Sequence, residues 1–201
     1  TLQRRELVDG YQSVITSLSL RPVVDEAAGI EIDLPTALVR FDRYEAPFAH
    51  YEPVTDDGVK VILISLTGDA TTLAAYFDIM QMLEIVPTEG ERSLGRESFT
   101  IEGRNDRITS HTFVRRAGDA IKGFTLVWPQ GDEQRRTRVL QDMRDSFVRR
   151  SGTLDAVADL AEDRRADLIA GLEVRRPTLS RSGFYVDSSG AVVTSAEAVQ
   201  N

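Results

Sequence analysis

The stretch "VKVILISL" (Val59–Leu66) decides the fold class, because it is apolar at almost every position. A strand with one face in water alternates apolar and polar residues, whereas a strand buried on both faces shows a nearly continuous apolar run. We therefore predict a central strand here, buried on both faces. Asp56-Asp57-Gly58, directly before it, is a turn signal of the hairpin type.

Further strands are expected on both sides of this run. Residues 37–42 alternate apolar and polar side chains, and the later segments are joined by short polar loops rich in Gly, Asn and Asp. The other predicted strands are Gly29–Pro35, Ala37–Asp42, Phe48–Val54, Ser98–Glu102, Arg107–Arg115 and Ile121–Trp128.

Two helices interrupt these strands. The first is predicted from Ala70 to Ile85, with Asp69 or Thr71 as its N-cap and Pro87 after its end. The second is predicted over residues 133–149, behind Asp132. The resulting order predicts an α+β fold with a mostly antiparallel sheet and helices packed on it.

The two flanks carry weaker patterns. A helix is expected over residues 1–20, a connector over 21–29, a helix over 154–172 and a linker over 173–182. The chain closes on a predicted hairpin with strands at 183–187 and 191–195. Its open edges lead us to expect that it docks on the domain, pairs with another chain or is mobile.

Composition excludes several classes of function. The net charge of −8 argues against nucleic acid or an anionic membrane as a general partner. With no cysteine and only two histidines, no metal or cofactor site is expected. The apolar runs are too short to span a bilayer. The first residue is Thr and no secretory signal is visible, so further chain is expected upstream.

No segment between residues 30 and 150 has the pattern of an active site. His111, on a predicted strand face with Arg107, Thr109, Phe113 and Arg115, lacks a nucleophile and an orienting carboxylate at a known spacing. We interpret it as a structural or surface residue, and His50 likewise, although its neighbours Phe48 and Tyr51 could line a groove.

Other polar motifs have structural interpretations. "LTGDATT" (Leu66–Thr72) places Asp69 where an anion would bind at a helix start, so Asp69 is interpreted as a cap. Trp128 is expected in the core. The acidic pairs Asp56-Asp57 and Asp142/Asp145 are typical of turns and helix surfaces, and no catalytic residue is assigned.

Residues 29–148 resemble the PsbP-like and DcrB-like α+β fold. The resemblance rests on "GIEIDLP", on the order of elements, on "IKGFTLVWP" and on the closing Ser146-Phe147. It implies a binding or assembly module. The start, "TLQRRELVDGYQ" (residues 1–12), is similar to the last helix of a small peptidoglycan-binding domain.

The end, "SGFYVDSSGAVVTSAEAV" (residues 182–199), is similar to the first hairpin of trypsin-like, HtrA-type serine peptidases. In that family the second strand leads to the catalytic histidine, and Glu197 stands in its place here. A carboxylate with a pKa of about 4 is a poor base for a serine hydroxyl near neutral pH. The resemblance therefore implies a degenerate peptidase whose other catalytic residues would follow residue 201.

Together these resemblances predict the middle of a longer bacterial envelope protein. Its expected parts are a peptidoglycan-binding tail (1–28), an α+β domain (29–150), a helix and linker (151–182) and a peptidase hairpin (183–201). The expected role is a non-catalytic, extracytoplasmic scaffold that binds a protein or peptidoglycan. An active serine endopeptidase and a cell-wall adaptor remain as alternatives, and the oligomeric state stays open.

Overall fold

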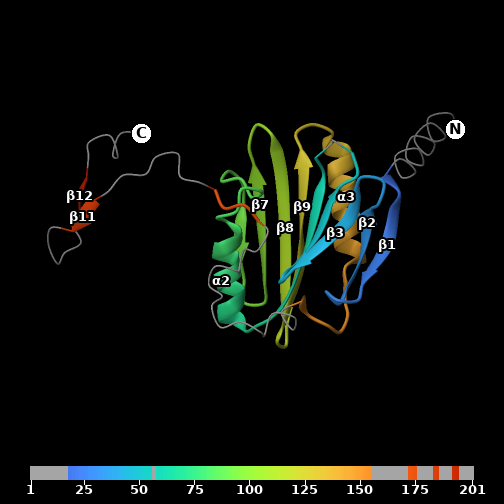
Figure 1. The fold of residues 1–201 in the computed structure, drawn as a ribbon, viewed down its shortest axis with the longest axis horizontal. Coiled ribbons are helices and arrows are strands. Elements are labelled where there is room, and N and C mark those ends of the chain that lie inside the picture. Colours follow the sequence, from blue (N-terminus) through green and yellow to red (C-terminus); the bar gives the residue numbers. More distant parts are fainter. Residues whose placement is uncertain (1–17, 56–57, 155–171, 176–182, 186–191, 195–201) are drawn as a thin grey trace.

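The computed structural model describes residues 18–55, 58–154, 172–175, 183–185 and 192–194. Its main sheet is built from β3 (Val39–Glu45), β4 (Phe48–Pro53), β5 (Lys60–Thr67), β6 (Arg92–Leu94), β7 (Ser98–Arg104), β8 (Ile108–Ala117) and β9 (Ala120–Pro129). The seven strands lie in the order β3-β4-β5-β9-β8-β7-β6, and every neighbouring pair is antiparallel (Figure 1).

A smaller sheet and two helices cover the main sheet. The smaller sheet has the order β1-β2-β10, with β1 (Leu20–Asp25), β2 (Ile30–Pro35) and β10 (Val148–Arg149). It lies with α3 (Glu133–Ser146) on one side of the main sheet, and α2 (Ala70–Met80) lies on the other (Figure 1). The predicted α+β class, with a mostly antiparallel sheet and helices packed on it, is confirmed.

β5 joins the two cores, as its sequence predicted. It lies between β4 and β9, and its residues from Val61 to Leu66 are all buried. Val61 and Leu63 enter the core under α3 and the small sheet, while Ile62 and Ile64 enter the core under α2. Because successive side chains point to opposite faces, the continuous apolar run lets one strand serve both cores.

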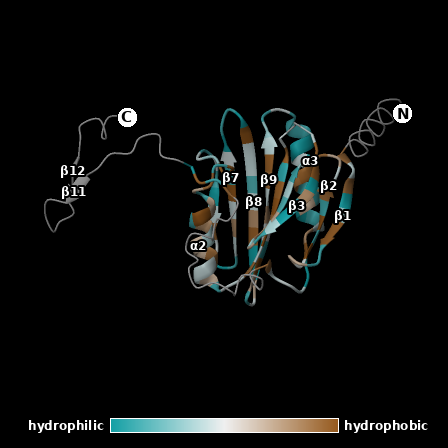
Figure 2. Cartoon of the chain, viewed as in Figure 1, coloured by the Kyte–Doolittle hydropathy of each residue, from teal (hydrophilic) through white to brown (hydrophobic). Residues whose placement is uncertain are grey.

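α3 is a strongly amphipathic helix. Val139 and Met143 are its buried residues, and most of the rest of its surface is hydrophilic (Figure 2). Its N-cap Asp132 accepts a hydrogen bond from the Arg135 backbone N–H. It ends at Ser146, so the prediction of a helix to residue 149 overran it by three residues.

Two other predictions along the chain are wrong in part. Residues 20–25 form β1 and not a connector; Pro22 obscured the strand, and this proline is tolerated because β1 is an edge strand. α2 ends at Met80, five residues before the predicted end at Ile85. Leu83 and Val86 are still buried in the α2-side core, but through a turn beyond the helix.

The short strands β6 and β10 were not predicted. They have three and two residues, too few to show a period of their own. At the C-terminal end, β11 (Gly183–Tyr185) and β12 (Val192–Thr194) pair antiparallel with each other, as the predicted hairpin requires.

The other flanking predictions fall largely on residues that the structure does not describe. The expected helices at 1–20 and 154–172 lie almost wholly there, and the four domain boundaries remain predictions. Among the helices that the structure does describe, none combines the length and apolarity needed to cross a membrane.

Candidate functional site

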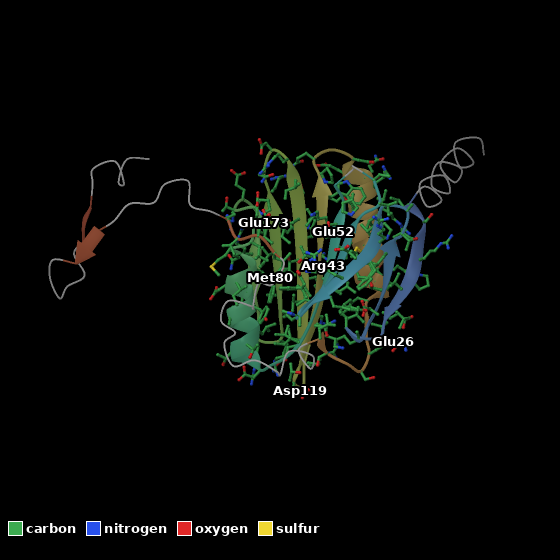
Figure 3. The ribbon with its side chains drawn as sticks, in the orientation of Figure 1. Glu26, Arg43, Glu52, Met80, Asp119 and Glu173 are labelled. Atoms are coloured by element: carbon green, nitrogen blue, oxygen red, sulfur yellow. The ribbon has the colours of Figure 1, made fainter. Side chains whose placement is uncertain are left out.

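A groove lies on the α2 side of the main sheet, beyond the part that α2 covers. It consists of two adjoining hollows of about 760 and about 520 Å³. Both hollows are lined by Glu84, Arg107 and Glu173, so we treat them as one continuous feature and call it the groove. Figure 3 labels Arg43 and Glu52 on its strand side and Glu173 on the opposite wall.

Strand register brings the residues of the groove floor to one face. His50 on β4 is paired with Ile62 on β5, and Val127 on β9 is opposite Lys60 on β5. Ser110 on β8 is opposite Val127, so Ile108, two residues earlier, points to the same face. The floor is therefore mainly apolar, with one imidazole in it.

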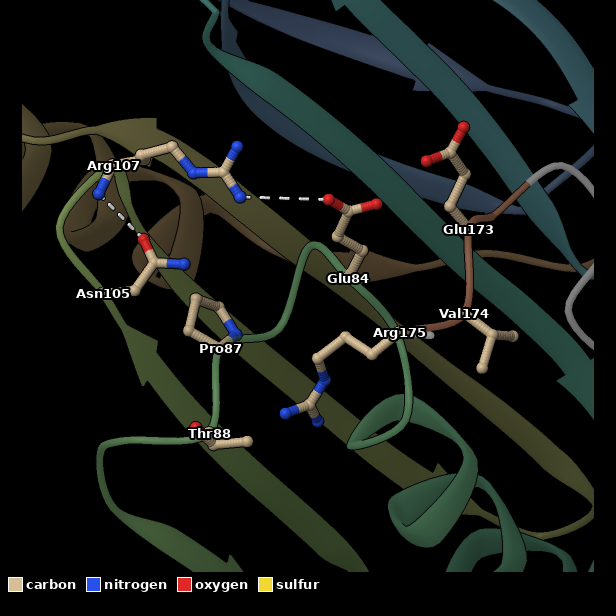
Figure 4. Close-up of a pocket in the computed structure, with 8 residues that line it drawn as sticks. All are labelled: Glu84, Pro87, Thr88, Asn105, Arg107, Glu173, Val174 and Arg175. Carbon is tan, nitrogen blue, oxygen red and sulfur yellow. Dashed lines mark hydrogen bonds and ion pairs between the residues drawn. The ribbon is translucent and has the colours of Figure 1, made fainter. Parts of the chain in front are cut away.

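Charged residues of both signs form the rim. Lys60 Nζ lies 3.0 Å from a carboxylate oxygen of Glu52. Arg107 Nη2 lies 3.9 Å from a carboxylate oxygen of Glu84, a pair that Figure 4 shows. The Arg107 side chain is 74% exposed and that of Glu84 is 49% exposed. Exposed pairs of this kind contribute only about 0–1 kcal/mol each, so the rim charges can exchange partners at low cost.

Residues 172–175, which we call the return segment, form one wall of the groove. The Glu84 backbone N–H donates to the Glu173 carbonyl oxygen at 2.7 Å, and the Arg175 N–H donates to the Met82 carbonyl oxygen at 2.9 Å. Figure 4 shows Glu173, Val174 and Arg175 beside the chain that leaves α2.

His50 is the most deeply buried titratable group of the groove. Its side chain is 2% exposed, and Nε2 lies 3.4 Å from Oε2 of Glu45; in the described part of the chain neither atom has a hydrogen-bond partner. Burial, aided by the charge of Arg43, lowers the pKa of His50, so the ring is neutral near pH 7. The sequence-based suggestion that Phe48 and Tyr51 line a groove with it is wrong, since both are core residues.

His111 lies on the opposite face of the sheet, away from the groove. Its Nδ1 is 3.4 Å from a carboxylate oxygen of Glu102, and burial lowers its pKa. In the described ranges neither ring nitrogen has a hydrogen-bond partner, so no activated hydroxyl accompanies it. Within the same ranges no three His, Asp or Glu side chains gather in a way that could hold a metal ion.

The remaining predicted residues have structural roles where they are described. Asp69 caps α2 by accepting the Thr72 N–H at 2.9 Å. Trp128 is 4% exposed in the core under α3, and Asp142 pairs with Arg138 at 2.8 Å. Asp56, Asp57 and Glu197 lie outside the described residues, so the interpretation of Glu197 stays untested.

Sequence reasoning missed the buried ammonium of Lys122. Nζ donates to the carbonyl oxygens of Ala28 (3.0 Å), Gly29 (2.7 Å), Arg150 (2.8 Å) and Gly152 (2.6 Å). "GIEIDLP" and "IKGFTLVWP" therefore meet at this point, which we call the Lys122 cage. The available signal was a lysine inside an otherwise apolar strand, which requires a buried set of acceptors.

Comparisons with known proteins found similar structures but no related sequence family. No family model matches the chain, and no curated protein matches it. Similar solved structures include a point mutant of the protein Mog1, 12% identical, covering 66% of this chain and 96% of that one with a TM-score of 0.48. The Ran-binding protein Mog1p of Saccharomyces cerevisiae is 12% identical, over 70% of this chain and 98% of that one, with a TM-score of 0.46.

A third similar structure comes from Bacteroides thetaiotaomicron. It is 8% identical, over 65% of this chain and 48% of that one, with a TM-score of 0.42. At these values none of the three similarities assigns a function to this chain.

The expected membership of the HtrA-type trypsin-like peptidases is wrong. The two similar structures that carry a protein name are Mog1 proteins and not peptidases. The peptidase resemblance rested on a short hairpin, a motif that many unrelated folds contain. The peptidoglycan-binding interpretation has no support, and the extracytoplasmic location stays a prediction.

Proposed function

We propose that this protein is a non-catalytic protein-interaction module, and that its groove binds a segment of a partner protein. The observation that carries the proposal is the groove itself, a continuous hollow with an apolar floor and a rim of exposed charges of both signs. Apolar burial would supply affinity, while the rim charges would select partner and orientation.

The charge pattern favours a protein segment over a small anion or cation. The rim carries Arg43, Lys60 and Arg107 together with Glu52, Glu84 and Glu173, so it has no dominant sign. The groove is not purely apolar, since its rim is charged and its floor holds His50.

The chemistry of the groove supports a binding role. His50 has a carboxylate nearby, but among the described residues its Nε2 has no hydrogen-bond partner. Nucleophilic catalysis by a side chain needs a hydroxyl or thiol within hydrogen-bonding reach of the base, and His50 Nε2 has none there. The arrangement offers recognition groups instead.

Site-specific photo-crosslinking in cells that produce the protein tests the proposal. A benzophenone amino acid replaces Arg107 in the groove, and in the control it replaces Arg115, which is exposed near the far end of β8. We expect a covalent adduct with another protein from position 107 and none from 115. The charge reversal Glu84→Lys should weaken the adduct. Equal adducts from both positions, or none from 107, would refute the proposal.

A further inference from the structure

The return segment shows how an extended chain fits the groove wall. Its contact with the chain after α2 is an antiparallel bridge between Leu83 and Val174. The bridge is completed by the hydrogen bonds from Glu84 to Glu173 and from Arg175 to Met82, and the Arg175 guanidinium also donates to the Gln81 carbonyl oxygen. We call the backbone of residues 82–84 the docking edge.

This contact is small compared with the ladders of the main sheet. It has one bridge, whereas β8 and β9 pair over ten residues. Val174 is 38% exposed and Met82 is 49% exposed, so little apolar surface is buried there. Leu172 supplies the apolar anchor by packing against the α2-side core. A segment held this way can be exchanged for another of similar chemistry.

We propose that the docking edge receives an extended segment of the partner protein, and that the return segment occupies this edge in the partner's absence. The inference rests on the function proposed above and names its mode, which is addition of a strand to an exposed backbone edge. Binding of a partner would then require displacement of the return segment.

The chemistry of the return segment indicates what such a partner would carry. Its backbone must offer a carbonyl to the Glu84 N–H and an N–H to the Met82 carbonyl. An apolar side chain is needed at the place of Leu172, and a basic one at the place of Arg175, which reaches the Gln81 carbonyl. The position of Val174 is more permissive because its side chain is partly exposed.

Peptide binding by strand-release variants tests this inference. The probe is a fluorescent peptide, AGLEVRRPT, that copies residues 170–178 of this chain. Arg175→Pro, in the full chain, removes both the N–H that donates to Met82 and the guanidinium. We expect this variant to bind the peptide at least about tenfold more tightly than the wild-type chain, which corresponds to about 1.4 kcal/mol.

Matched controls separate release of the edge from general loosening. Val174→Ala keeps both backbone hydrogen bonds and should bind the peptide no better than wild type. A peptide with aspartate at the leucine position should not bind. Leu172→Asp provides a second release variant, which removes the apolar anchor and leaves the backbone donors in place.

The outcomes are separable. No gain in peptide binding by either release variant, with unfolding still cooperative, would overturn the inference. Equal binding by the wild-type chain would do the same, because an occupied edge cannot accept a second strand. Either result leaves the crosslinking test at position 107 unaffected, so failure of the docking edge is distinguishable from failure of the groove.

Discussion

Replacing Lys122 with methionine should destabilise this fold more than the same replacement at Lys60, the other lysine of the chain. The Lys122 side chain is 1% exposed, and its ammonium is shared by four carbonyl oxygens. These oxygens belong to the chain just before β2 and just after β10, which lie side by side, so the Lys122 cage fastens one end of the small sheet to β9. Methionine keeps the length of the side chain and removes every donor.

The magnitude follows from the acceptors left behind. Ala28 O still accepts from Ser65 Oγ, and Gly29 O still accepts from the Arg150 N–H. The carbonyls of Arg150 and Gly152 are only partly buried, so water can replace some of what they lose; a hydrogen bond from a charged donor contributes about 1.5–3 kcal/mol. Relief from the desolvation of the ammonium offsets part of this, and we expect a net loss of about 3 kcal/mol.

Lys60→Met is the matched control. Lys60 is on the neighbouring strand, its side chain is 40% exposed, and it makes one ion pair, with Glu52. An exposed pair contributes about 0–1 kcal/mol, so the two lysine variants should differ by at least about 2 kcal/mol.

Burial and the charge of Arg149 lower the pKa of Lys122, while the four acceptors favour its ammonium form.

Urea denaturation measures this difference. Trp128, the single tryptophan, is buried in the core and reports unfolding by its fluorescence. With a slope of about 2 kcal/mol per molar urea, the expected loss moves the midpoint by about 1.5 M. If Lys122→Met and Lys60→Met show the same midpoint, the cage does not hold the sheets together and the reasoning is wrong.

Gly29→Ala extends the same test. Gly29 has φ +62, and a Cβ there would lie 2.3 Å from Lys122 Nζ and 2.4 Å from the Ser151 carbonyl oxygen. The substitution therefore disturbs the same cage, and its cost should overlap with that of Lys122→Met. A double-mutant cycle should give a coupling of at least about 1 kcal/mol; simple additivity would indicate that the two residues act independently.

Three further predictions concern titratable groups. Both histidines have a folded-state pKa below the ordinary 6.5, so around and below pH 6.5 the unfolded chain binds more protons than the folded chain. The free energy of unfolding should therefore fall as the pH drops from about 7 through the folded-state pKa values. Urea titrations at each pH measure this fall, which should be shallower in the double variant His50→Gln/His111→Gln. Asp69→Ala should destabilise the protein at pH 7, because it removes the cap of α2. Since hydrogen bonds from Thr72 lower the pKa of Asp69, the difference from wild type should vanish as the pH falls below 3.8 and through the folded pKa, and persistence at acid pH would contradict the capping role. Asp25→Asn should lower the pKa of Tyr44 from about 12, though not fully to 10, because burial is the larger cause of the raised pKa. Ultraviolet titration of the tyrosines measures this pKa. An unchanged value would mean that the 3.0 Å hydrogen bond from Tyr44 to Asp25 is not formed in solution.

Local patterns predicted the elements that are long and regular. The apolar run at Val59–Leu66 became β5, and Asp69 and Asp132 became the N-caps of the two helices. The predictions failed where a neighbour distant in the chain decides the structure. β1 forms because β2 pairs with it, and β10 has only two residues, which gain regular structure through their pairing with β2.

The candidate site was less predictable than the fold. Of the groove residues only His50 was considered, and for a different reason, its aromatic neighbours. The rest of the floor comes from strands that meet through antiparallel register, and the wall comes from a segment more than ninety residues after α2. No periodicity or spacing in the sequence connects these residues.

What the sequence by itself determined is the order and type of the principal strands and helices, because hydrophobic periodicity and helix caps depend on residues close together in the chain. Only the tertiary structure decided that Ile62, Val127 and Glu173 share one groove, and that Lys122 meets the carbonyl of Gly29. Those arrangements depend on register and on which faces the layers leave open. Both are settled by the packing of the whole domain around the two faces of β5.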